Sequence, residues 1–181
     1  KKNFLLLLAL LATTPLWAYD FQVGNLHYNI LDENNVEVTT GPHSDKVIII
    51  PETVNYNDMM YSVISIGDSA FQLNRDLLSV SIPKSILNIG DWAFGFCDAL
   101  TSIIIPNSVQ SIGVGAFFKC SSLTSITIPN NVQNIGSGAF SGCNSLVSIT
   151  LSNSITSIEG STFNSCEELR SITLPNTITS I

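Results

Sequence analysis

The chain has 181 residues, which is long enough for one domain with a sizeable core, and it carries 14 acidic against 7 basic residues, a formal net charge of −7. This balance argues against a nucleic-acid or anionic-membrane partner, because phosphate binding needs clustered Lys and Arg and no such cluster occurs.

The first predicted segment, residues 1–18, has the layout of a secretory signal peptide. Lys1 and Lys2 give it a positive end, an apolar run follows, and Pro15 precedes the small residue Ala18, after which we expect cleavage. The apolar run is shorter than the about 20 residues that cross a bilayer. We therefore expect a mature chain without a membrane span, either secreted or held at the cell surface.

Residues 19–45 are predicted to form a β-rich N-terminal cap. Strand-like stretches over 21–23, 26–30 and 36–39 are separated by Gly-Asn and Asn-Asn turn signals. The segment precedes a repeated array, and its expected role is to shield the first repeat unit from water.

A hairpin-like insert over 55–61 interrupts the first unit of the array. It contains two tyrosines and two methionines: Tyr56, Met59, Met60 and Tyr61. These side chains either offer an apolar contact to a partner or pack back on the cap, and the sequence leaves both alternatives open.

Residues 46–181 form the array, in which large apolar residues recur every 23 positions. The phenylalanines are Phe71, Phe94, Phe117, Phe140 and Phe163, and the cysteines are Cys97, Cys120, Cys143 and Cys166. A fixed period of this length predicts a solenoid, because each short unit can bury its apolar side chains only by stacking on its neighbours. The pattern stops in mid-unit, so we expect an array that is incomplete at the C-terminus.

The unit that begins at Leu123 shows the elements expected in each coil. Ile126 and Ile128 alternate with polar residues and predict a short strand with one buried face, which a proline ends. Gly136 is expected to permit a bend, and a single short helical turn around Phe140 is expected to follow.

In two other units an aspartate, Asp68 or Asp91, stands at the N-cap position of that turn. The predicted fold class is therefore an α/β-type solenoid of short parallel strands and short helical turns, with the β-rich segment at its N-terminus.

The combined pattern, Leu-x-x-Ile-x-Ile-Pro-x-x-Val-x-x-Ile-Gly-x-x-Ala-Phe-x-x-Cys, resembles the 23-residue leucine-rich repeat of the treponemal or BspA-like class. The resemblance implies a bacterial surface protein, since proteins of this class are implicated in adhesion to matrix proteins, host cells or other bacteria. Ser152, Glu159 and Thr162 depart from the pattern within one unit, which is expected to be bent or looser.

On the leucine-rich repeat model, the outward strand positions form a candidate binding face. Most of these residues carry hydroxyls, and few are the aromatic or Arg side chains that anchor tight interfaces. Hydroxyls in register also bond across strands or hold water, so a solvated sheet face is the alternative. The fifteen residues are Leu78, Ser79, Ser81, Thr101, Ser102, Ile104, Thr124, Ser125, Thr127, Val147, Ser148, Thr150, Arg170, Ser171 and Thr173.

The four cysteines are predicted to be free thiols stacked as a buried ladder. An even number of cysteines in a secreted chain also suggests disulfides, but parallel side chains on stacked coils give poor sulfur-to-sulfur geometry. Zinc sites bring ligands in pairs two to four residues apart, and no such pair occurs, so no metal site is expected.

The sequence predicts a non-catalytic protein without a cofactor. His27 and His43 are the only histidines, both lie outside the repeats, and no Gly-x-Ser-x-Gly motif accompanies the many serines. We expect an adhesion-type scaffold that binds extracellular or host proteins or other cell surfaces. A structural spacer that displays another domain and a carbohydrate-binding module are the alternatives, the latter with Trp92 as its one candidate platform.

Overall fold

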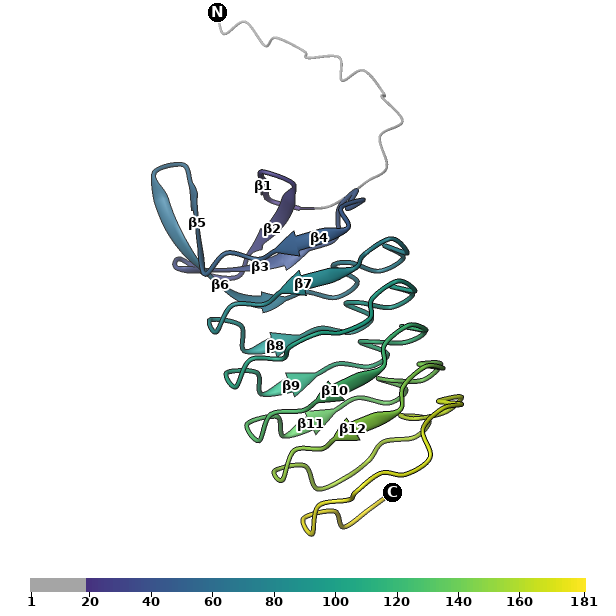
Figure 1. The fold of residues 1–181 in the computed structure, drawn as a ribbon. Coiled ribbons are helices and arrows are strands. Elements are labelled where there is room, and N and C mark those ends of the chain that lie inside the picture. Colours follow the sequence, from purple (N-terminus) through teal and green to yellow (C-terminus); the bar gives the residue numbers. More distant parts are fainter. Residues whose placement is uncertain (1–18) are drawn as a thin grey trace, which may run out of the picture.

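The computed structural model describes residues 19–181, so the predicted signal peptide and its cleavage site lie outside the described residues. Figure 1 shows a stack of coils with a group of strands at its N-terminal end. The strands are β1 (Phe21–Val23), β2 (Leu26–Ile30), β3 (Asn35–Thr39), β4 (Val47–Ile49), β5 (Thr53–Tyr56), β6 (Met59–Ile66), β7 (Ser79–Ser81), β8 (Asn88–Ile89), β9 (Ser111–Ile112), β10 (Ser125–Thr127), β11 (Asn134–Ile135) and β12 (Ser148–Thr150). The described part of the chain contains no helix, and therefore none that is long and apolar enough to cross a membrane.

Strands of successive coils pair in parallel along two rows. In one row β6, β8, β9 and β11 are neighbours, and Asn88, Ser111 and Asn134 share one register at the repeat spacing. In the other row β4 pairs with β7 and β10 pairs with β12. Their inward side chains join one continuous apolar core, so the predicted stacking of parallel strands is confirmed.

The phenylalanines of the repeat form one column through the stack. Ring centroids are 5.4 Å apart for Phe71 and Phe94, and 5.3 Å apart from Phe94 to Phe117 and from Phe117 to Phe140. The last step, from Phe140 to Phe163, is 6.0 Å. The rings are stacked nearly parallel, and only Phe163 is not fully buried, because it lies in the last described coil.

The prediction of a short helical turn in each coil is wrong. Two residues per coil have a positive φ, and a right-handed helix cannot pass through left-handed residues. The segment is instead a series of reverse turns whose N–H groups alternate between coils: Cys143 N donates to Phe140 O, whereas Phe140 N donates to Thr162 O of the next coil. The left-handed residues are Ser69, Leu73, Trp92, Phe96, Gly115, Lys119, Gly138, Gly142, Ser161 and Ser165.

The aspartates expected to cap those turns bind the neighbouring coil instead. Asp68 Oδ1 accepts a hydrogen bond of 2.8 Å from Asp91 N, and Asp91 Oδ1 accepts one of 2.7 Å from Val114 N. Without a helix there are no orphaned helical N–H groups to cap, so the carboxylates satisfy backbone donors between coils.

Gly136 is predicted to permit a bend in the chain, but in the structure it allows two coils to approach closely. Its φ is not positive, and a Cβ there would lie 2.4 Å from Val114 N. Glu159 occupies the equivalent position of the next coil. In the described residues its N–H makes no hydrogen bond equivalent to the one from Gly136 N to Ile112 O. The unit with the sequence departures is looser at this point, as expected.

The three strand-like stretches of residues 19–45 coincide with β1, β2 and β3, which pair antiparallel in that order. β3 then pairs in parallel with β6, so this sheet continues directly into the row of coils. Phe21 of the edge strand β1 packs against two tyrosines, with ring centroids 4.2 Å from Tyr56 and 5.3 Å from Tyr28.

The predicted insert is the hairpin of β5 and β6, which turns at the left-handed residues Asn57 and Asp58. Some of its aromatic and thioether side chains pack back on the N-terminal strands, and others are exposed and could contact a partner. Tyr56 packs on Phe21 and Tyr61 is buried, whereas Met60 is 67% exposed.

Candidate binding face

Strand alternation positions the candidate binding face. In β10 and β12 the central residues Ile126 and Ile149 point into the core, and the flanking serines and threonines point outward. The same alternation holds in β7 around Val80. As a result, all fifteen residues predicted for this face are exposed.

The structure brings six of these residues into register with one another across coils. Ser125 pairs with Ser148 and Thr127 with Thr150 in parallel ladders, and single bridges join Ser102 to Ser125 and Thr150 to Thr173. Hydroxyl groups at the repeat spacing therefore lie in rows along the stack.

Most hydroxyls of the candidate binding face are free to bond outside the molecule. Among its eleven serines and threonines, only Thr124 has a side-chain hydrogen bond within the described chain, to Thr101 O at 3.4 Å. Arg170 is its one charged residue. Apart from Arg170 the face is thus uncharged and rich in unengaged donors and acceptors, which suits a bound partner and also the bound water of the solvated-face alternative.

The row of strands is interrupted at one step. No backbone hydrogen bond joins residues 78–82 to residues 101–105 in the part of the chain that the structure describes. A groove of about 520 Å³ lies there, lined by Val47, Ile49 and Ile104 among others. Ile49 is 71% exposed and Ile104 is 83% exposed, so this part of the face is apolar.

Val47 and Ile49 were missed as members of the face. The signal was present, because the buried Ile48 and Ile50 flank them in the same alternation that identified the later strands. A second groove of about 520 Å³ at the other end of the face is more polar than the first. It is lined by three threonines and three asparagines among others: Thr127, Thr150, Thr173, Asn107, Asn130 and Asn153.

The four cysteines form the predicted ladder of free thiols. Each Sγ donates to the carbonyl oxygen of a phenylalanine in the preceding coil, for example Cys120 to Phe94 O and Cys143 to Phe117 O, both at 3.2 Å. Burial raises the pKa of the Cys143 thiol to about 12. These thiols are consequently poor nucleophiles and metal ligands.

His27 and His43 lie against each other near the N-terminal end of the phenylalanine column. Their ring centroids are 5.2 Å apart, and His43 lies 5.0 Å from Phe71. Burial, and secondarily the nearby His43, lowers the pKa of His27. No group of three or more His, Cys, Asp or Glu side chains in residues 19–181 is arranged to hold a metal ion.

Trp92, the single candidate sugar platform, lies in the turn segments, away from the candidate binding face. Its indole packs over the backbone of Gly115, where a Cβ would approach it to 3.1 Å. The rings of Phe96 and Phe118 lie next to it, with centroids 6.4 and 5.0 Å away. Sequence reasoning did not group these three residues, although Phe96 and Phe118 occupy adjacent coils.

The family model described as BspA type leucine rich repeat region matches residues 64–181 in six copies. No curated protein sequence is significantly similar to this chain.

Among solved structures, a leucine-rich repeat protein from Bacteroides ovatus is 34% identical, with a TM-score of 0.67 over 88% of this chain and 48% of that one. The Treponema pallidum leucine-rich repeat protein is 32% identical, with a TM-score of 0.77 over 83% and 69% of the two chains. A leucine-rich cell surface protein from Faecalibacterium prausnitzii is 29% identical, with a TM-score of 0.66 over 89% and 50%. The chain spans about half the length of the first of these structures.

Proposed function

Because the chain belongs to the BspA-type leucine-rich repeat family, we propose that it is a non-catalytic adhesion scaffold, secreted or held at the cell surface. Its expected partners are extracellular or host proteins, or other cell surfaces. The predicted signal peptide and the similarity to a cell surface protein of Faecalibacterium prausnitzii support this location.

The observation that carries the proposal is the state of the candidate binding face. Its hydroxyls are exposed, six of them lie in register, and almost all are unbonded within residues 19–181. An apolar groove at Ile49 and Ile104 adjoins them. A partner that covers this face gains apolar burial in the groove and hydrogen bonds along the rows, without displacing internal partners of those hydroxyls.

The test measures binding of immobilised matrix proteins to the mature chain and to a variant carrying Thr101→Glu, Thr124→Glu and Val147→Glu. We expect the variant to lose binding, because carboxylates would be buried unpaired at the interface. The matched control adds the same charge at exposed positions outside the face, with Gln110→Glu, Gln133→Glu and Thr156→Glu, and retains binding. No binding by any of the three proteins would favour the spacer.

For residues 19–45 we propose a capping role. Tyr28, Val36 and Val38 are buried in the same core as the first coils, and the His43 ring covers the end of the phenylalanine column at Phe71. Removing the segment would expose Phe71 and its neighbours to water.

A further inference from the structure

Three aromatic side chains outside the phenylalanine column form a cluster, the aromatic patch of Trp92, Phe96 and Phe118. Phe96 and Phe118 contact edge to face at 5.3 Å, and Trp92 lies near both. All three side chains are only half-buried. Two further exposed apolar residues lie in the neighbouring coils, since Leu73 N bonds to Gly95 O and Trp92 N bonds to Val114 O.

The repeat does not require these aromatics. Trp92 and Phe96 have φ values of 56° and 60°, a left-handed backbone that bulky side chains disfavour and glycine adopts freely. The unit that contains Phe140 folds in the same way with small residues at the three equivalent positions, Gly138, Ser141 and Gly142. Large rings held in a strained backbone, where glycine suffices, point to a role beyond folding.

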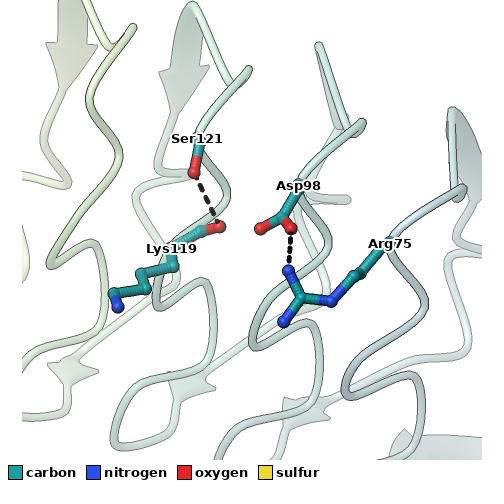
Figure 2. Close-up of polar contacts among 4 residues, drawn as sticks. All are labelled: Arg75, Asp98, Lys119 and Ser121. Atoms are coloured by element: carbon teal, nitrogen blue, oxygen red, sulfur yellow. Dashed lines mark hydrogen bonds and ion pairs between the residues drawn. The ribbon is translucent and has the colours of Figure 1, made fainter.

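Two cations accompany the patch. Lys119 Nζ lies 5.5 Å from the centroid of Phe96 and 5.6 Å from that of Phe118, and the Arg75 guanidinium lies 5.9 Å from Phe96. Arg75 pairs with Asp98 at 2.6 Å. Figure 2 shows this pair with Lys119 on the same side of the stack. In residues 19–181 no carboxylate lies within ion-pair distance of Lys119.

We propose that the aromatic patch and Lys119 form a second interaction site, which binds a protein segment carrying apolar side chains and a carboxylate. Aromatic side chains such as Trp and Phe are enriched in protein interfaces, and the unpaired ammonium of Lys119 supplies the complementary charge. An acidic sugar fits less well, because the cations and the neighbouring rings already occupy the faces of Phe96 on which a sugar would stack. The site is separate from the candidate binding face.

The experiment selects peptides from a randomised display library on the mature protein and measures their affinity for matched variants. One variant carries Trp92→Gly, Phe96→Gly and Phe118→Ser, the residues of the unit around Phe140, so its backbone is already compatible with the fold. We expect enrichment of peptides that combine Asp or Glu with apolar residues, and binding weakened about tenfold or more in this variant.

A second variant, Lys119→Glu, leaves the rings in place and tests the charge, and it is expected to bind these peptides more weakly than Lys119→Gln does. The variant with glutamates at Thr101, Thr124 and Val147 is expected to bind the peptides as the unmodified protein does, which separates this site from the proposed adhesion face. The proposal would be overturned by enrichment of peptides without acidic residues, by equal binding to the patch variants, or by no enrichment at all. Binding of hyaluronan, an acidic sugar, in place of peptides would also overturn it.

Discussion

Single residues stabilise the coil stack through columns that run along its axis. Each internal phenylalanine contacts a ring above and a ring below, and each cysteine thiol donates to a phenylalanine carbonyl oxygen in the preceding coil. Every such residue therefore contributes to two coils at once, and its energetic weight depends on its position in the column.

Phe140→Ala is expected to cost about 3 to 5 kcal/mol, because the fully buried ring leaves a cavity between two others. Phe163→Ala is expected to cost less, since Phe163 is half-buried and lies 6.0 Å from its one stacked neighbour in the described chain. Denaturant unfolding of the two variants measures the difference, and equal losses would contradict the column.

The buried thiols predict a loss of stability at high pH. Burial raises the pKa of the Cys143 thiol from 9.0 to about 12, so between these values the unfolded chain binds fewer protons than the folded one. The free energy of unfolding should then fall by up to about 1.4 kcal/mol per pH unit for this thiol, whereas below pH 9.0 it contributes no slope. Cys143→Ala should show a shallower slope in melts across this range, and identical slopes would contradict the prediction.

At the scale of the element, the coil is built from strands and left-handed turns, and the glycines set how closely two coils approach. Gly113 and Gly136 face the backbone of the preceding coil, where a Cβ would lie 2.6 Å from Asp91 N and 2.4 Å from Val114 N respectively. The bond from Gly136 N to Ile112 O depends on this approach, and it has no counterpart where Glu159 replaces the glycine.

Gly136→Ala is expected to destabilise the protein by about 1 to 3 kcal/mol, because the backbone of the preceding coil cannot move aside for the methyl group. Gly160→Ala is the matched control: its φ is not positive and a Cβ there meets no atom within 4 Å, so its effect should stay within about 0.5 kcal/mol. Thermal melts of both variants provide the comparison, in which a tolerated Gly136→Ala would show that the coils can separate.

At the scale of the whole molecule, each coil contacts only its neighbours, so stability is the sum of coil and interface contributions. The ladders keep one register at the repeat spacing through β8, β9 and β11. For this reason whole coils can be added to the stack or removed from it, and the coils that remain pack on one another in the same way.

Deletion of residues 124–146, one full repeat, should leave a folded array with a lower free energy of unfolding, because Leu123 and Leu146 occupy equivalent buried positions. Deletion of the first half of that repeat alone should prevent folding, since it shifts inward side chains to the surface. Circular dichroism and urea unfolding distinguish the two, and equal disruption by both deletions would contradict nearest-neighbour stacking.

Much of the candidate binding face could be predicted from the alternation of residues such as Ile126 and Thr127, because burial alternates along any strand with one face in a core. The turns could not be predicted in the same way. An apolar spacing like that around Phe140 suits one helical turn, and only the glycines at 115, 138 and 142 hinted at left-handed backbone.

The sequence by itself determined the stacking of coils, the phenylalanine and cysteine columns and the exposed positions of the strands, because a fixed period repeats one local burial pattern. The tertiary structure decided what depends on contacts between coils: the partners of Asp68 and Asp91, the gap in the strand row beside Ile104, and the cluster of Trp92, Phe96 and Phe118. Apart from the pair of Trp92 and Phe96, such contacts join residues about one repeat apart. Their geometry follows from how closely two backbones approach, which no local pattern records.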